Sequence, residues 1–411
     1  MVAVIVGVVT MLIAAGVAAL IVRDNSVVTT SPTTTTATKS PATSPTTSTT
    51  RPSTASSTTT ATTDLDRFVD EAMAFIEKER GLKYTTRPTV IVLDDAAFVA
   101  RFNQLIDDDA KQNAELYDDT TGIFQAIGLL SRDMTYVDAE KLIGAGGVLG
   151  YYDQVSKELR VRAGQVTPYI RTVIVHELTH ALDDQRFDLN RPQYDTADDE
   201  IGFGFSALAE GNAKRVEDAY RATLSAADQA SANAEEQTLS LSGAAGLSKL
   251  SYALLQLEYA PYDVGERFVK AVLANGGQAA LDRVFADPPH TSEQVIDPTK
   301  YFAKEGRRNV PAPAADGTVF KSGVFGEIVL QMMLTSAVSS NAAATAATGW
   351  AGDWFVAWRE SNRVCLRADF AMDTAKDSTE LRDALTKWAQ TRPSAKVGNA
   401  GDAVELTSCS R

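Results

Sequence analysis

The chain has 411 residues, enough for one large domain or two medium ones with tails, and 44% of them are hydrophobic, an ordinary share for a globular protein. The formal net charge is -14. This charge argues against nucleic acid as a partner, because phosphate backbones are bound through Lys and Arg, and against a polybasic mode of membrane-surface binding.

The first 22 residues contain no charged side chain and consist mainly of Val, Ile, Leu and Ala. Because about 20 apolar residues suffice to cross a bilayer as a helix, we expect residues 1–22 to form a transmembrane anchor, with an uncleaved signal segment as the alternative. Residues 23–63 are almost entirely Thr, Ser, Pro and Ala, which predicts a disordered stalk. Together they predict a single-pass protein of the cell membrane whose C-terminal part is extracytoplasmic.

The remaining chain shows helical and strand patterns in alternation. Three short strands are expected, at residues 89–93, 148–152 and 158–162, and the last two flank a turn as in a hairpin. Helices are expected after Asp64, after Asp94 or Asp95, over residues 110–130 and over most of residues 167–281. The predicted fold class is α+β, mainly helical.

Residues 173–182 contain the pattern HExxH, formed by His176, Glu177 and His180. On a helix, positions i and i+4 lie about 40° apart and about 6 Å along the axis, so both imidazoles can bind one metal ion. Glu177 lies beside that metal and can take a proton from an activated water. The flanking residues are uncharged, as a buried active-site helix requires. The alternative is a pair of histidines that share helical spacing without a metal.

A catalytic zinc site needs a third protein ligand and one open position. The only other histidine, His290, is far along the chain, so a carboxylate is the natural candidate. Glu210 stands on an apolar helical segment with small neighbours, where a charge is costly unless it is paired or bound to metal. Glu200 is the rival, but it ends an acidic run that we expect to be a solvated loop.

Five segments resemble a group of bacterial and archaeal gluzincin-type zinc metalloproteases. They are HELTHALDDQ at residues 176–185, ALAEG at 207–211, GYYD at 150–153, the PPHTSEQ and DPTKY stretch at 288–301, and GWAGD at 349–353. The resemblance spans most of residues 65–390. It implies a zincin-like fold with a small sheet and an active-site helix, zinc held by His176, His180 and Glu210, and Glu177 as general base.

The resemblance also divides the chain and shows two departures. It implies a catalytic region over residues 64–243 and a mainly helical C-terminal subdomain over residues 244–411 that completes the cleft. Asp183 replaces a Gln that is usual in the group, which we expect to be harmless at the surface. Asp297 stands where the group often has His, so any role of that His is lost or altered here.

Weaker candidates surround this core. Asp184, four residues after His180, could orient a ligand imidazole or could be a surface carboxylate at the helix end. Tyr262 is our choice for a donor to the oxyanion, with His290 and Tyr151 as alternatives. The strand at 148–152 could pair with an extended peptide or be an ordinary buried strand.

The sequence supports three readings of function. The first is a zinc metallopeptidase that hydrolyses peptide bonds of a peptide or protein substrate. The second is a non-catalytic zincin-fold module for binding or cell-envelope assembly, and the third is hydrolysis of a non-peptide amide. Glu177 favours the first, because a binding module has no need of it. Cys365 and Cys409 lie outside any metal-ligand spacing, and in an oxidising compartment we expect them to pair rather than to remain separate thiols.

Overall fold

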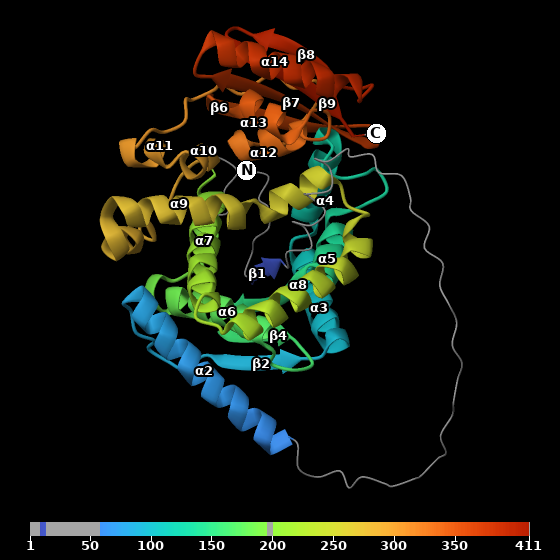
Figure 1. Cartoon of the computed structure of the whole chain (residues 1–411). Helices are drawn as coiled ribbons and strands as arrows, with labels where there is room; N and C mark the ends of the chain where they lie inside the picture. The colour runs from blue at the N-terminus through green and yellow to red at the C-terminus, as the bar shows by residue number, and fades with distance from the viewer. Residues whose placement is uncertain (1–8, 14–57, 195–199, 411) are drawn as a thin grey trace, which may run out of the picture.

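The N-terminal part of the protein is built around a four-stranded sheet. The computed structural model describes residues 9–13, 58–194 and 200–410 (Figure 1). The strands of this sheet lie in the order β1-β3-β4-β2, and their bounds are Val9–Ile13 for β1, Thr89–Leu93 for β2, Val148–Asp153 for β3 and Glu158–Arg162 for β4. Strand β3 is antiparallel to β1 and β4, whereas β2 is parallel to β4. The three predicted strands are therefore confirmed.

The predicted transmembrane anchor is wrong as far as the structure describes it. Val9–Ile13, inside the expected span, is a strand whose backbone pairs with β3, with Met11 opposite Tyr151. Among the described residues, no helix combines the length and the apolar character needed to cross a bilayer. The predicted single-pass membrane localisation with an extracytoplasmic domain depended on that anchor, so it is wrong as well. Residues 1–8, 14–22 and the expected stalk up to residue 57 lie outside the described residues, and the helix α2 (Thr58–Arg80) begins before the stalk was expected to end.

Four helices precede or flank the sheet's strands in the chain. Helix α3 (Asp95–Gln112) begins where the sequence predicts, because the Asp94 carboxylate accepts a hydrogen bond from the backbone N–H of Ala97 at 2.8 Å. The helix expected over residues 110–130 is interrupted at Asn113. It continues as α4 (Ala114–Ile127), and α5 (Tyr136–Gly146) leads into β3.

Long helices then carry the chain across the middle of the molecule. They are α6 (Pro168–Phe187), α7 (Ile201–Arg221), α8 (Ala226–Leu247) and α9 (Tyr252–Val284), with a short 3-10 turn at Pro192–Tyr194. Helices α7 and α9 approach closely at Gly211 and Gly265, where a Cβ on either glycine would overlap the backbone of the other helix. This close crossing holds α7 between α6 and α9.

The C-terminal part contains a second sheet that the sequence analysis missed. Residues 244–411 were expected to be mainly helical, yet five antiparallel strands lie there in the order β5-β6-β7-β9-β8. Their bounds are Val319–Gly323, Trp350–Glu360, Arg363–Met372, Lys396–Ala400 and Ala403–Cys409 for β5 to β9. The helices of this part are α10 (Ser292–Ile296), α11 (Pro298–Ala303), α12 (Gly326–Leu334), α13 (Ser340–Ala347) and α14 (Ala375–Gln390).

The second sheet lies at the end of the molecule opposite α2 and β2 (Figure 1). A disulfide joins Cys365 on β7 to Cys409 on β9, so the predicted pairing of the two cysteines is confirmed. The sheet is not isolated, because Phe124 of α4, Leu366 of β7 and Trp388 of α14 belong to one continuous hydrophobic core.

Candidate metal centre

Helix α6 carries the HExxH sequence through the interior of the protein. It begins at a favourable place, since the side chain of Thr167 accepts a hydrogen bond from Ile170 N at 3.2 Å and Pro168 stands in the first turn. Every side chain from Thr172 to Asp184 is buried. The uncharged flanks of the motif therefore serve burial, as the sequence predicts.

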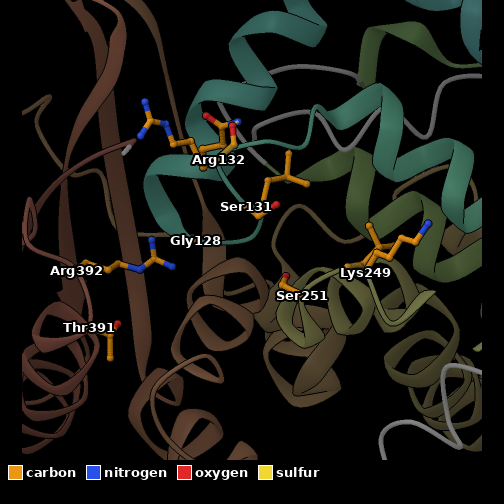
Figure 2. Close-up of a pocket in the computed structure, with 10 residues that line it drawn as sticks. Gly128, Ser131, Arg132, Lys249, Ser251, Thr391 and Arg392 are labelled. Carbon is orange, nitrogen blue, oxygen red and sulfur yellow. Dashed lines mark hydrogen bonds between the residues drawn. The ribbon is translucent and has the colours of Figure 1, made fainter. Parts of the chain in front are cut away.

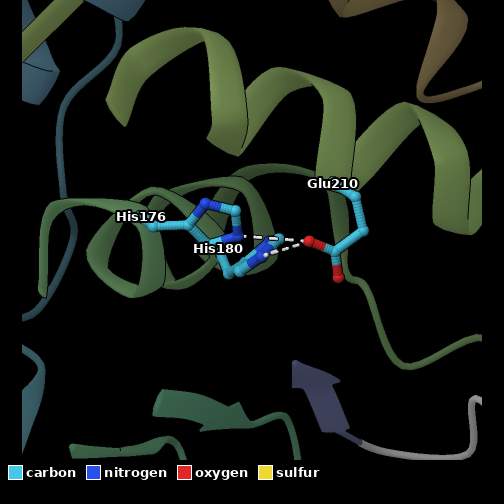
Figure 3. Close-up of side chains that lie close together, drawn as sticks. All are labelled: His176, His180 and Glu210. Carbon is cyan, nitrogen blue, oxygen red and sulfur yellow. Dashed lines mark hydrogen bonds and ion pairs between the residues drawn. The ribbon is translucent and has the colours of Figure 1, made fainter. Parts of the chain in front are cut away.

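The two histidines of α6 meet one carboxylate of α7. Oε2 of Glu210 lies 3.1 Å from Nε2 of His176 and 3.3 Å from Nε2 of His180 (Figure 3). The imidazole centroids are 4.8 Å apart, and all three side chains are buried. Each of the three offers one ligand atom within 4.8 Å of the others. The structure thus brings together the three residues that were predicted to bind metal.

The surrounding polar atoms fit a metal ion in this position. Both carboxylate oxygens of Glu177 and both ring nitrogens of His180 are buried, and none of them has a hydrogen-bond partner among the described residues. The 3.3 Å contact of His180 with Glu210 is close enough for an ion pair but lacks hydrogen-bond geometry. Unsatisfied buried polar groups are rare in proteins and require an explanation. Two imidazoles and a carboxylate are the donor set that zinc accepts.

The charge balance points the same way. Burial alone would lower the pKa of His176, but its hydrogen bonds to Glu210 and Glu217 outweigh burial and raise it to about 10. Burial alone would raise the pKa of Glu210, but the imidazoles of His180 and His176 lower it. The buried carboxylates around His176 therefore favour a positive charge at the place where the two Nε2 atoms converge. A divalent cation would supply that charge.

Glu177 lies against strand β3 of the first sheet. Gly150 of β3 lies against it, because a Cβ on Gly150 would be 3.1 Å from Cγ and 3.2 Å from Oε1 of Glu177. A larger residue at position 150 would push against the carboxylate. Burial raises the pKa of Glu177 well above its usual value. Strand β3 consequently passes directly beside the predicted general base.

Glu217 is a functional candidate that the sequence analysis missed. Its Oε2 lies 3.2 Å from Nδ1 of His176, on the side of the ring away from Glu210, and its side chain is buried. A carboxylate on the second nitrogen of a metal-binding histidine fixes the tautomer and the ring orientation. Glu217 follows Glu210 by two helical turns, so both lie on the same face of α7. The seven-residue spacing from Glu210 was the sequence pattern that could have predicted this role for Glu217.

Asp184, predicted to orient a ligand imidazole, has other partners. Its Oδ2 accepts hydrogen bonds from the hydroxyl of Tyr152 at 2.7 Å and from Nζ of Lys157 at 2.6 Å. Its Oδ1 accepts from the backbone N–H of Leu189 at 3.0 Å. The carboxylate ties the end of α6 to β3 and to the turn that follows β3.

Asp183 is not at the surface, contrary to the prediction. It is fully buried and accepts hydrogen bonds from Nη2 of Arg80 at 2.8 Å and from the amide of Asn212 at 2.5 Å. Arg80 is itself fully buried at the end of α2. The carboxylate therefore joins α2, α6 and α7 behind the metal-binding face, which explains why its burial is tolerated.

The three oxyanion candidates lie in different places. Tyr262 on α9 is close to the cluster, with its ring centroid 6.2 Å from that of His176. Tyr151 packs against Phe98 and Phe102, whereas its neighbour Gly150 faces Glu177. Since successive side chains of a strand point to opposite faces, Tyr151 points away from Glu177. The side chain of His290 is exposed, and its backbone N–H donates to Gln294.

Glu200, the rival ligand, lies at the far end of α7 from the cluster. It immediately precedes the helix, ten residues before Glu210, which corresponds to about 15 Å of helix. The expectation of a solvated loop is wrong at this residue, because Glu200 is buried and accepts a hydrogen bond from Ser292 N at 3.0 Å. One side chain cannot span that length to share a metal with His176 and His180.

Two other groups in the described residues have ligand atoms at metal-binding spacing. One contains Cys365 and Cys409, whose sulfurs are bonded to each other. The other contains Glu293, Glu305 and Asp373, and Nζ of Lys300 lies 2.6, 2.8 and 3.1 Å from them. An ammonium group therefore already pairs with all three carboxylates, so the cluster on α6 and α7 is the better candidate.

Residues 317–408 match the family described as "Domain of unknown function (DUF8575)", which covers the second sheet from β5 into β9. No curated protein matches the chain. Among solved structures, the chain is similar to one described as "Crystal structure of a putative hydrolase with a novel fold from Chloroflexus aurantiacus". The identity is 18%, the match covers 59% of this chain and 89% of that chain, and the TM-score is 0.35. A likeness at that TM-score carries no argument about fold or activity.

Proposed function

We propose that this protein is a zinc-dependent metallopeptidase with a zincin-like core. The observation that carries the proposal is a buried Glu177 that accepts no hydrogen bond from the described residues and lies close to the cluster of His176, His180 and Glu210. A zinc ion held by these three side chains would act as a Lewis acid and lower the pKa of water. A module that only binds metal or another protein would gain nothing from an unpartnered buried carboxylate at this position.

The residues of the chain have separate roles in this proposal. A carboxylate oxygen of Glu177 takes a proton from the attacking water and then delivers it to the nitrogen of the leaving amine. Glu217 holds the imidazole of His176 through Nδ1. Tyr262, whose ring lies near that of His176, donates a hydrogen bond from its hydroxyl to the oxyanion that forms on the substrate carbonyl.

A peptide is the substrate that we propose, because the HExxH segment resembles that of gluzincin-type zinc metalloproteases. Strand β3 lies beside Glu177, and the contact between Gly150 and Glu177 fixes it there. Its backbone pairs with β1 on one edge and with β4 on the other, so β3 is an interior strand and offers no free edge to an extended chain.

The test combines metal content with cleavage of a peptide library by the purified full chain. We expect about one zinc per chain and cleavage that a chelator abolishes. Glu177→Gln should keep the zinc and lose cleavage. The matched control is Glu327→Gln, which neutralises another buried glutamate on α12 outside the cluster and should cleave as wild type. Cleavage by Glu177→Gln at the wild-type rate would overturn the mechanism. Zinc binding without any cleavage would favour the non-catalytic reading.

A further inference from the structure

A pocket lies where the C-terminal part meets the helices that precede it. Its volume is about 480 Å³, and it is lined by the segments that follow α4, α8 and α14 (Figure 2). Small-molecule sites in proteins usually measure about 300–1,000 Å³ and often lie between regions of a chain. The size and the place are therefore those of a ligand site, and none of the lining residues belongs to the candidate metal centre.

The pocket has a charge opposite to that of the protein as a whole. Arg132, Lys249 and Arg392 line it, and no Asp or Glu does, although the chain carries a net charge of -14. Each of these basic side chains follows the C-terminal end of a helix, so each could simply offset the negative end of that helix dipole. A helix C-terminus carries roughly half a negative charge, so three of them offset only about half of three unit charges. Counted over its lining residues alone, the pocket therefore remains net positive.

Arg392 is held in place at one side of this pocket. Its guanidinium carbon lies 4.6 Å from the ring centroid of Trp388, a side chain that is fully buried. On the other side it reaches Gly128, where a Cβ would overlap the guanidinium and where φ is +82°. A residue other than glycine would be strained at that φ and would displace the arginine. A guanidinium fixed by its surroundings loses little conformational entropy on binding.

The other two bases lie at the rim. Arg132 and Lys249 are exposed and come from segments outside residues 317–408, whereas Arg392 lies within them. In Figure 2, Arg392 and Lys249 stand on opposite sides of the pocket. The hydroxyl side chain of Ser131 also lines it and adds a neutral hydrogen-bonding group. A ligand would thus be held by one fixed and two mobile cations.

We propose that this pocket binds a small molecule through a phosphate or carboxylate group. Arginine recognises both groups through paired hydrogen bonds, and lysine adds a point charge. A small ligand fits better than an acidic polymer, because the positive charge is confined to a pocket on an otherwise acidic chain. The ligand would bind residues on both sides of the boundary at which the C-terminal family match begins.

The experiment is calorimetric titration of the full chain with inorganic phosphate and, separately, with succinate, at constant ionic strength. We expect saturable binding of about one ion per chain. If phosphate binds more tightly than succinate, the natural ligand carries a phosphate group, and the reverse order indicates a carboxylate group. Arg392→Gln should weaken binding roughly tenfold or more. If that variant fails to fold, Arg132→Gln and Lys249→Gln carry the test, because both side chains are exposed.

Two controls separate this pocket from general charge effects and from the metal centre. Lys376→Gln removes an exposed lysine on α14 that pairs with Glu380, and it should leave binding unchanged. His180→Ala breaks the candidate metal centre and should bind the anion as tightly as wild type. The absence of saturable binding by either ion would overturn the proposal. So would wild-type affinity in the pocket variants, or loss of binding in His180→Ala.

Discussion

Buried carboxylates are treated differently in the candidate metal centre and in the C-terminal part. Asp353 on β6 is fully buried and accepts three hydrogen bonds, from Phe325 N at 2.8 Å, Gly326 N at 2.9 Å and Nε1 of Trp350 at 2.9 Å. Glu177 on α6 is equally buried and accepts none among the described residues. Leaving a buried polar group unsatisfied costs about 1–3 kcal/mol.

This difference separates structural charge from functional charge. The carboxylate of Asp353 fixes the start of α12 and the side chain of Trp350, so its burial is compensated within the fold. No hydrogen-bond donor among the described residues compensates Glu177 in this way. A protein retains such a group when the group does something else, and in our proposal it moves protons.

The largest expected effect comes from changing Glu177 itself. Glu177→Gln should lower kcat/KM for peptide cleavage by about 10²–10⁴-fold, because a general base contributes that much. The same variant should raise the free energy of unfolding of the metal-free protein by about 1–3 kcal/mol as pH rises above the ordinary pKa of a glutamate, because burial penalises the ionised carboxylate but not the neutral amide. Denaturant unfolding together with steady-state kinetics measures both.

Asp353→Asn is the matched change in the other region. Its amide group would turn two hydrogens towards N–H donors, so the free energy of unfolding should fall by about 1–3 kcal/mol while cleavage per folded molecule stays the same. The two variants should shift stability in opposite directions. A shift of the same sign in both would show that satisfaction of hydrogen bonds does not distinguish the two sites.

The disulfide provides the next effect in size. Cys365 and Cys409 are separated by 44 positions, and closing a loop of that length stabilises the folded state by about 4 kcal/mol in the chain-entropy model. The double variant with Ala at both positions should lose about that much unfolding free energy. Its zinc affinity should not change, because neither cysteine touches α6 or α7. Zinc loss at a temperature where the variant is still folded would show that the second sheet supports the metal centre.

Glu200 connects the two regions and predicts a pH dependence. Burial raises the pKa of Glu200 to about 8, with Ser292 N–H lowering it and the nearby Asp353 raising it. Because the folded pKa lies above the unfolded value, the unfolded chain binds fewer protons between about pH 4.5 and pH 8, and stability falls as pH rises through that window. Glu200→Gln should flatten this fall, with a gain on the order of a few kcal/mol at pH 8 relative to pH 5.

Subtracting the variant's free energy of unfolding from that of wild type at each pH removes the contributions of the other titrating groups. The comparison of denaturant unfolding at several pH values measures the difference. An identical slope in the two proteins would mean that Glu200 ionises freely, in conflict with its burial against Ser292 and Gly326.

The sequence predicted the parts of the site that depend on local spacing. His176, Glu177 and His180 follow from one helical repeat, and Glu210 follows from a charge placed among small apolar residues. The strands at residues 89–93 and 158–162 also have the predicted bounds. The first is a short β-branched run, and the second alternates charged and apolar residues after a turn.

The parts that depend on contacts between distant segments were not predicted. Asp183 looked like a surface residue because its partner, Arg80, is 103 positions away. The hairpin of β6 and β7 was missed although both strands are rich in aromatic and apolar residues and meet at a tight turn at Ser361–Asn362, where Ser361 has φ +56°. Helical composition around α14 masked that signal.

The choice between Asp184 and Glu217 gives the smallest expected effect and the sharpest test of the site. Sequence spacing from His180 favoured Asp184, whereas the structure places Glu217, at 3.2 Å, on Nδ1 of His176. Loss of a carboxylate that orients a metal-binding histidine usually weakens metal affinity about 10- to 100-fold. Glu217→Gln should therefore weaken zinc binding by that factor, as measured by competition with a chelator of known affinity.

Asp184→Asn is the control, because it also removes one buried negative charge near the motif. Its carboxylate contacts Tyr152, Lys157 and Leu189 N, so the substitution should lower the free energy of unfolding without changing zinc affinity. A structural role for Glu217 would lower stability in the same manner and leave zinc binding intact. Equal zinc affinity in wild type and Glu217→Gln would remove Glu217 from the site, and weaker zinc binding in Asp184→Asn would restore the residue that sequence spacing favoured.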